Sequence, residues 1–187
     1  MNFQNRNPRR REAGFRRPLI AHGLGMFFFF VGQFLGSQFP KEVLRVFAEP
    51  AGRLAAAFLN VAVDSSGDVI QLLHPQIDIA ITDACSGYDF FCLIGALWVG
   101  WAAFSFRSRT SSYLWILLIL PMAWIITLVG NVSRIVCATQ VRLLTPESMG
   151  SSFDGVIHQS VGVIVFLSVL ILFWKTLTHC HDRTCRA

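Results

Sequence analysis

Four runs of predominantly apolar residues recur along the chain, each about 20 residues long, the length an α-helix needs to cross a bilayer core. They cover Leu19 to Phe39, Gly87 to Phe106, Tyr113 to Gly130 and Ser160 to Leu177. Pro121 lies inside the third run, where a membrane helix tolerates it. The pattern predicts an all-α integral membrane fold with about four transmembrane helices.

The segment from Lys41 to Val63 differs, because charged residues interrupt its apolar positions. A charged side chain at the centre of a bilayer is costly. An apolar helical face opposite a charged one is typical of an amphipathic helix lying in the membrane interface. We expect such an interfacial helix here, kinked at Pro50. The alternative, a fifth span, would place one of the basic clusters of the chain on the outer side.

Two irregular segments separate the apolar runs. Asp64 to Asp68 is a turn signal, and the alternation from Ile77 to Thr82 is typical of a strand. We therefore expect a small extracytoplasmic β-hairpin that leads into Cys85. Residues 145–157 are rich in Ser and Gly and are predicted to form a loop.

Composition and charge support a membrane setting. Hydrophobic residues make up 53% of the chain and charged residues 14%, against about 25% charged in a soluble domain. With four spans, eleven of the sixteen Lys and Arg lie on the side of the first tail, and nine of the eleven acidic residues lie on the other. Basic flanks mark the cytoplasmic side. We expect a multi-pass protein of the cell inner or plasma membrane.

The domain organisation follows from the same charges. Residues 1–18 form a basic cytoplasmic tail without regular structure, 19–178 a single membrane domain, and 179–187 a second cytoplasmic tail. The basic residues of the first tail flank an apolar run, which is a juxtamembrane pattern, so a nucleic-acid partner is not expected. Membrane lipid is the expected surrounding.

Three chemically suited residues reach the outer face under this topology. Cys85 precedes the second run, Arg134 follows the third, and His158 precedes the fourth. A thiol at a helix start has a lowered pKa, a nearby imidazole can exchange its proton, and a guanidinium can stabilise an oxyanion. These residue types favour acyl transfer through a thioester at the extracytoplasmic face.

Other polar residues have supporting or competing roles. Asp89, one helical turn after the thiol, is placed to orient His158 or Arg134. Asn131, three residues before Arg134, faces the same side if that stretch is helical, and Ser86 follows the thiol directly. His74 is the rival histidine on the outer side. The five cysteines show no disulfide framework, and we expect neither a cofactor nor a metal.

The residues Ala84-Cys85-Ser86-Gly87, then Asn131-Val132-Ser133-Arg134, then His158 before the last run resemble the exosortase/archaeosortase family. The resemblance implies an exosortase-like membrane domain, with Cys85 as nucleophile, Arg134 as transition-state cation and His158 as acid and base. It also implies an exported protein substrate with a C-terminal sorting signal: a short motif such as Pro-Glu-Pro, a tail helix and a basic cluster. The acceptor of the acyl group stays unknown.

Two other functions compete with this membrane cysteine protease or transpeptidase. A non-enzymatic membrane assembly or transport subunit would use the same polar groups to hold helices together. A thiol redox protein is disfavoured, because the sequence has no Cys-x-x-Cys pair.

Overall fold

The computed structural model describes residues 8–65, 69–81, 85–105, 109–145 and 151–186. The first half contains α1 (Pro8–Gln38), α2 (Pro40–Val43), a π-helical turn η1 (Leu44–Ala48), α3 (Glu49–Leu59) and strands β1 (Ala62–Asp64), β2 (Ile70–Leu73) and β3 (Asp78–Ile81). The second half contains the helices α4 (Tyr88–Ser105), α5 (Arg109–Leu144) and α6 (Ser151–Arg186).

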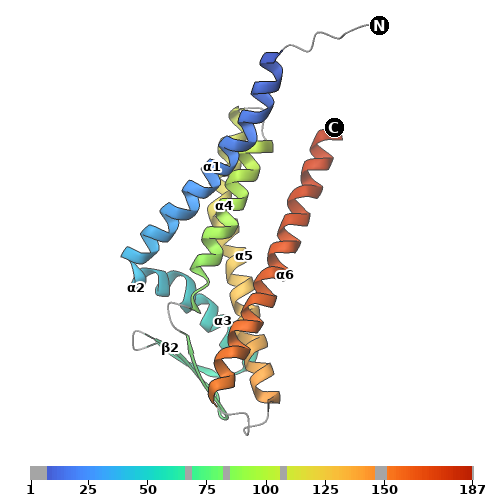
Figure 1. The fold of residues 1–187 in the computed structure, drawn as a ribbon. Coiled ribbons are helices and arrows are strands. Elements are labelled where there is room, and N and C mark those ends of the chain that lie inside the picture. The colour runs from blue at the N-terminus through green and yellow to red at the C-terminus, as the bar shows by residue number, and fades with distance from the viewer. Residues whose placement is uncertain (1–7, 66–68, 82–84, 106–108, 146–150, 187) are drawn as a thin grey trace.

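The four long helices form a bundle and alternate in direction. The start of α1 and the end of α6 lie at one end of the molecule, and the sheet with α2 and α3 lies at the other (Figure 1). Three helices are long and apolar enough to cross a membrane, over Leu19–Gln38, Leu118–Leu144 and Gly155–His179, and α4 has a shorter apolar stretch, Tyr88–Ala103. The chain is thus a mostly helical, multi-pass membrane protein, while the count of four spans stays a prediction.

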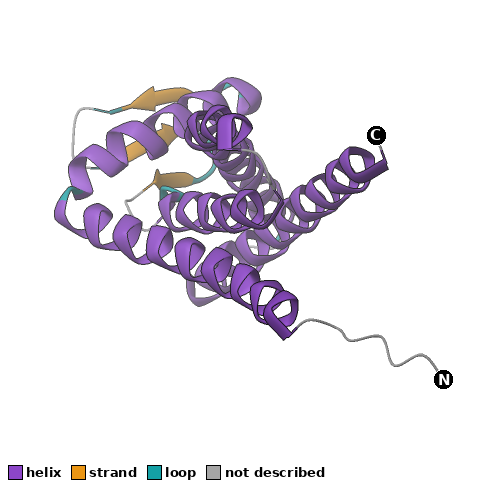
Figure 2. Ribbon diagram, turned by 90° about the horizontal axis from the view of Figure 1, so that it is seen from above, coloured by secondary structure: helices purple, strands orange, loops and turns teal. Residues whose placement is uncertain are grey.

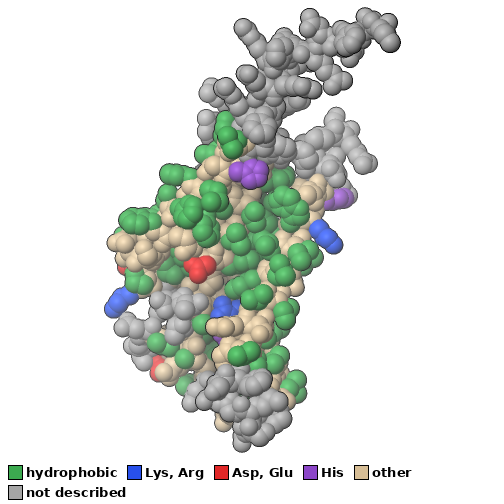
Figure 3. Space-filling view, viewed as in Figure 1, with side chains coloured by type: hydrophobic (Ala, Val, Ile, Leu, Met, Phe, Trp, Pro, Cys, Tyr) green, Lys and Arg blue, Asp and Glu red, His purple; other side chains and the backbone are tan. Residues whose placement is uncertain are grey.

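The surface agrees with this setting. Apolar side chains cover much of the long helices in Figure 3, and charged side chains are sparse among them. Exposed examples include Phe27, Phe34 and Leu172, at 68%, 65% and 65% exposed. Such side chains on a bundle surface are favourable in contact with lipid.

Three predicted boundaries were wrong. The helix α5 continues through Gly130 to Leu144 without a break, so Arg134 lies within the helix rather than past its end. The helix α6 begins at Ser151 and takes in part of the predicted 145–157 loop. The helix α1 begins at Pro8, inside the basic tail, because proline suits the first position of a helix. Residues 1–7 and 187 of the two tails lie outside the described residues.

The predicted amphipathic segment is helical but in pieces, as α2, η1 and α3. Pro50 lies in the first turn of α3, where its missing N–H costs no helical hydrogen bond. Small residues form the buried face of α3: Ala51, Gly52, Ala55 and Ala56. On the exposed face Arg53 pairs with Glu49 at 2.6 Å. The segment follows the end of α1 and runs past the start of α4 toward α5 (Figure 1), and its position in the membrane interface stays a prediction.

The strands form an antiparallel sheet in the order β1-β2-β3. Ile70 pairs with Ile81 between β2 and β3, which is the expected hairpin, although residues 66–68 of the predicted turn and Thr82 lie outside the described residues. Ala62 pairs with Leu73 and adds β1 as a third strand. Its three residues are too short to show an alternation, so the sequence pattern did not reveal it. Figure 2 shows the strands beside the helical bundle.

Two apolar cores result. Ile70, Leu72 and Ile81 of the sheet pack with the small residues of α3 and with Val132 and Ile135 of α5. The second core joins α4, α5 and α6 farther from the sheet. The residues that it buries are Phe90, Ile94, Trp98, Ala102, Ile119, Ala123, Phe173 and Leu177.

The helices α1 and α4 approach closely through glycines. A Cβ added at Gly25 would lie 2.8 Å from the backbone oxygen of Ala96, and one at Gly95 would lie 2.4 Å from Phe28. Small residues at a helix interface in a membrane let two backbones pack at short range. This contact fixes α1 against the helix that follows Cys85.

We expect Gly25→Ala to lower the free energy of unfolding by about 1–3 kcal/mol, because the new methyl group must displace backbone. Gly23→Ala is the matched control, since a Cβ there meets nothing within 4 Å. Equilibrium unfolding of both variants in detergent, with added dodecyl sulfate as denaturant, measures the difference. Equal stability of the two variants would show that α1 and α4 do not pack through these glycines.

Candidate active site

The inner face of α5 carries an unusual set of buried polar residues. Thr127, Asn131, Arg134 and Thr139 are all at most 8% exposed. The spacing of four and three residues places Thr127, Asn131 and Arg134 along one helical face, whereas Thr139 is buried on another side of the helix. Only Ser86, just before α4, joins them as a buried polar residue of the described chain. Buried polar groups in a membrane protein usually mark a functional site.

The Cys-Ser-Gly turn is held by this face of α5. The amide nitrogen Nδ2 of Asn131 donates to the carbonyl oxygen of Ser86 at 2.9 Å. The backbone N–H of Tyr88 donates to Oγ of Ser86 at 3.2 Å, so the hydroxyl caps the start of α4. Gly87 has a φ of 79°, and a Cβ there would lie 3.3 Å from both Asn131 and Thr127. The turn therefore requires glycine, and Asn131 and Ser86 position the thiol.

Cys85, Arg134 and His158 meet at the sheet end of the bundle. The Sγ atom of Cys85 lies 3.3 Å from Nε2 of His158, and Nη2 of Arg134 lies 2.5 Å from the same nitrogen. The three residues come from the turn before α4, from α5 and from the start of α6. The structure brings together the three residues that the sequence singled out, and their catalytic roles stay predictions.

The contact with arginine assigns the tautomer of His158. A guanidinium has N–H donors and no acceptor, so Nε2 must accept and the ring proton must lie on Nδ1. The same Nε2 atom lies beside Sγ of Cys85, which is the geometry of a base beside a nucleophile. Because this nitrogen has one lone pair, it accepts from either Arg134 or the thiol at any one time.

Two residues that the sequence analysis missed hold the guanidinium. The ring of Phe166 lies under Arg134, with 5.5 Å from Cζ to the ring centroid, which is a cation–π contact. Gly162, one turn before Phe166 on α6, leaves room for the guanidinium, since a Cβ there would lie 3.1 Å from Nε of Arg134. A glycine inside an apolar helix lowers the stability of that helix. Its presence in the last apolar run was the one feature of the sequence that could have indicated this contact. The Nε atom is buried and has no hydrogen-bond partner in the described residues.

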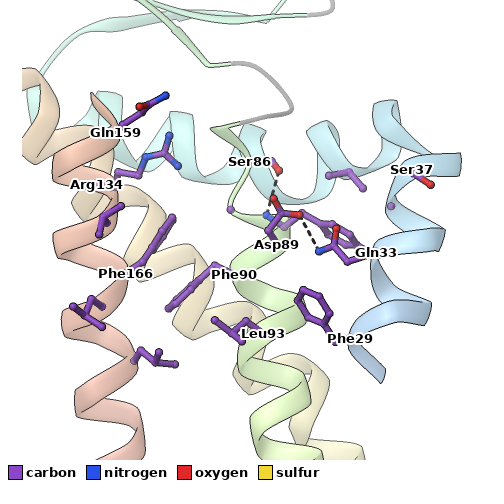
Figure 4. A pocket seen from close by; sticks show the side chains of 18 of the residues that line it. Phe29, Gln33, Ser37, Ser86, Asp89, Phe90, Leu93, Arg134, Gln159 and Phe166 are labelled. Atoms are coloured by element: carbon purple, nitrogen blue, oxygen red, sulfur yellow. Dashed lines mark hydrogen bonds between the residues drawn. The ribbon is translucent and has the colours of Figure 1, made fainter. Parts of the chain in front are cut away.

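Asp89 does not contact His158 or Arg134, contrary to the expectation that it would orient one of them. Its Oδ1 accepts a hydrogen bond of 2.9 Å from Nε2 of Gln33 on α1. Both side chains point into a cavity on the far side from Arg134 (Figure 4). The first turn of α4 directs Asp89 toward α1, whereas the thiol faces α5 and α6.

The remaining candidates lie elsewhere. Nδ1 of His74 accepts from the backbone N–H of Gln76 at 3.2 Å, within the turn between β2 and β3. Cys92 is buried among apolar side chains, Cys137 is exposed, and neither is in a disulfide. Among the described residues no group of three His, Cys, Asp or Glu side chains is placed to hold a metal ion.

A cavity of about 1250 Å³ opens beside the site, between α6 on one side and α1 and α4 on the other (Figure 4). Arg134 and His158 border it at the sheet end, and Phe29, Phe90 and Phe166 form part of its mostly apolar wall. A second cavity of about 550 Å³ continues along α1 and α4 toward the other end of the bundle. The site thus adjoins a long apolar groove.

Comparison with known proteins places this arrangement in a family. The family described as transmembrane exosortase matches residues 11–175, which includes all three residues of the site. No curated protein and no solved structure matches the chain. The match covers most of the membrane bundle, the sheet and the Cys-Ser-Gly turn. The chain therefore belongs to the transmembrane exosortase family.

Proposed function

We propose that the protein is a membrane cysteine peptidase or transpeptidase that processes the C-terminal sorting signal of exported proteins. The observation that carries the proposal is the 3.3 Å contact between Sγ of Cys85 and Nε2 of His158. A thiol at this distance from a base is an activated nucleophile. Membership of the exosortase family supports the substrate class.

In the first step the Sγ–C bond forms at the scissile carbonyl and the peptide C–N bond breaks. The thiol proton passes to Nε2 of His158 and then to the leaving amine nitrogen. This is general base and then general acid catalysis by one imidazole. The product is a thioester on Cys85 and a free tail segment.

Arg134 supplies the cation for this step. Nε2 has a single lone pair, so the N–H of Arg134 that it accepts must leave before the thiol proton can bind there. The guanidinium N–H is then released to the oxyanion that forms at the same moment. Proton transfer and oxyanion stabilisation are coupled through one nitrogen atom.

The apolar groove fits the tail helix of the substrate. It is bordered by α1, α4 and α6, and its sheet end reaches Arg134 and His158. A helix with side chains is about 10–12 Å across and needs an apolar wall in a bilayer. A tail helix seated here ends its apolar stretch beside the catalytic residues, where the extended segment begins.

In the second step an amine, a hydroxyl or water attacks the thioester. The new bond to the acyl carbon forms, the S–C bond breaks, and the proton of the acceptor returns to the thiol through His158.

The alternation of α1, α4, α5 and α6 supports four spans (Figure 1). The basic residues of the first tail favour termini in the cytoplasm, and the site then lies on the extracytoplasmic face.

Cys85→Ala and His158→Ala are each expected to lower the processing rate about a thousandfold or more, because each removes half of the nucleophile–base pair. Cys137→Ala and His74→Ala are matched controls away from the site. Immunoblots of a tail-bearing exported protein in cells carrying each variant follow the loss of the tail. Normal processing with Cys85→Ala would refute the enzyme and favour the assembly or transport subunit.

Gly162→Ala is expected to slow processing by about tenfold or more, because its methyl group displaces the guanidinium of Arg134 from its place. Gly130→Ala, one turn before Arg134, is the control, since its Cβ makes only ordinary contacts of 3.5–3.6 Å. Alkylation of Cys85 by iodoacetamide should be similar in both variants, which separates a misplaced cation from a misfolded site. A normal rate with Gly162→Ala would exclude the role of Arg134.

A further inference from the structure

The catalytic candidates stand between two spaces. A smaller cavity of about 260 Å³ lies between β3, α5 and α6, and both Cys85 and His158 border it. The large groove is bordered by Arg134 and His158, whereas Cys85 is not among the residues described around it. The thiol therefore faces the sheet side, and the imidazole separates the two spaces.

The smaller cavity meets the edge of β3 rather than one of its faces. Three consecutive residues, Ile79, Ala80 and Ile81, border it. Successive side chains of a strand point to opposite faces, so consecutive residues share a cavity only where it lies along the strand edge. The backbone of β3 thus borders the space that contains the thiol.

Within the described part of the chain, the outer edge of β3 is unpaired. β3 is the last strand in the order β1-β2-β3, and its ladder pairs it with β2 alone. Among the described residues no backbone hydrogen bond joins its outer edge to another segment. An unpaired strand edge is a ready template for an extended peptide, which adds to the sheet through main-chain hydrogen bonds.

The strand also leads to the nucleophile. β3 ends at Ile81, four residues before Cys85, which is at most about 13 Å of extended chain. Part of the cavity wall is apolar, with Ile135 and Ala138 from α5 and Ile157 from α6, while Thr139 and Arg142 of α5 also border it. A small or β-branched apolar side chain fits such a wall.

We propose that the open edge of β3 and the cavity beside it bind the extended segment that precedes the scissile bond of the substrate, as an added strand. The inference rests on the proposed function and deepens it. The tail helix lies in the large groove, the upstream segment lies along β3, and the peptide bond between them crosses His158. Main-chain pairing supplies the affinity, and the isoleucine-lined cavity selects the side chain nearest to the scissile carbonyl.

Peptidyl chloromethyl ketones test this placement on the full-length protein in detergent. Acetylated peptides of one to four alanine and valine residues alkylate a thiol: the Sγ–C bond forms, chloride leaves, and His158 takes the thiol proton. We expect the rate constant at Cys85 to rise with peptide length, by about fivefold for each main-chain hydrogen bond gained. N-methylation of one paired amide should remove that gain, because the methylated nitrogen cannot donate.

Gly155→Phe tests the cavity itself. Gly155 borders it, and a Cβ there meets nothing within 4 Å, so the position has room for a side chain, and we expect an aromatic ring there to obstruct the cavity. We expect this variant to lose the length dependence while its reaction with the small reagent iodoacetamide persists. Ile164→Phe, at an exposed position of the same helix, is the control and should keep the length dependence.

The outcomes separate this inference from the proposed function. If iodoacetamide labels Cys85 faster than Cys137 but peptide length, N-methylation or Gly155→Phe has no effect, the β3 site is wrong and the enzyme stands. If Cys85 reacts no faster than the exposed Cys137 with every reagent, the proposed function fails, and the inference fails with it.

Discussion

A guanidinium stays charged at any physiological pH, so the apolar bundle around Arg134 must supply groups that offset its burial. It does so with the imidazole of His158 on one side and the ring of Phe166 on the other. Gly162 is present because a larger residue on α6 would occupy the space of the side chain. The contacts of Arg134 therefore link α6 to α5 at the sheet end of the bundle, beside His158.

The same face of α5 positions the turn that contains Cys85. Asn131, one turn before Arg134, holds the carbonyl of Ser86, and Gly87 can take its left-handed backbone conformation beside it. One rigid helix thus positions both the thiol turn and the cation. This arrangement fixes the position of the two groups relative to each other, although α4 and α6 are separate elements.

Nε of Arg134 is a buried donor without a partner among the described residues. Leaving a buried donor without a hydrogen bond costs about 1–3 kcal/mol, which is usually tolerated only where the group has a function.

The two ends of the site differ in physical character. Toward the bundle it meets a large apolar groove whose walls suit a helix in lipid. Toward the sheet it meets a small cavity beside an open strand edge, which suits an extended chain. A protein substrate with a membrane tail has both parts in sequence, joined by a short segment. Glycine contacts hold α1 against α4, and the groove lies between these two helices and α6, beside His158.

Much of this molecule follows from its sequence alone. The apolar runs are local signals, since every backbone group in a membrane helix is satisfied within its own segment, and they located all four long helices. Successive spans cross the membrane in opposite directions, so counting them placed Cys85, Arg134 and His158 at the same end of the bundle. The structure also has them at one end. The boundaries of α5 and α6 could not be predicted from the sequence. A helix can continue beyond the bilayer, and no residue type marks the point where it leaves.

Tertiary structure alone decided what depends on contacts between distant segments. The approach of Arg134 and Cys85 to one nitrogen of His158, the support from Phe166, and the pairing of Asp89 with Gln33 all join different helices. The strand β1 exists only because β2 lies beside it, as three residues carry too little pattern of their own. Residue types revealed the available chemistry. Packing decided which atoms meet, because a shift of one helical turn changes every contact without changing the sequence pattern.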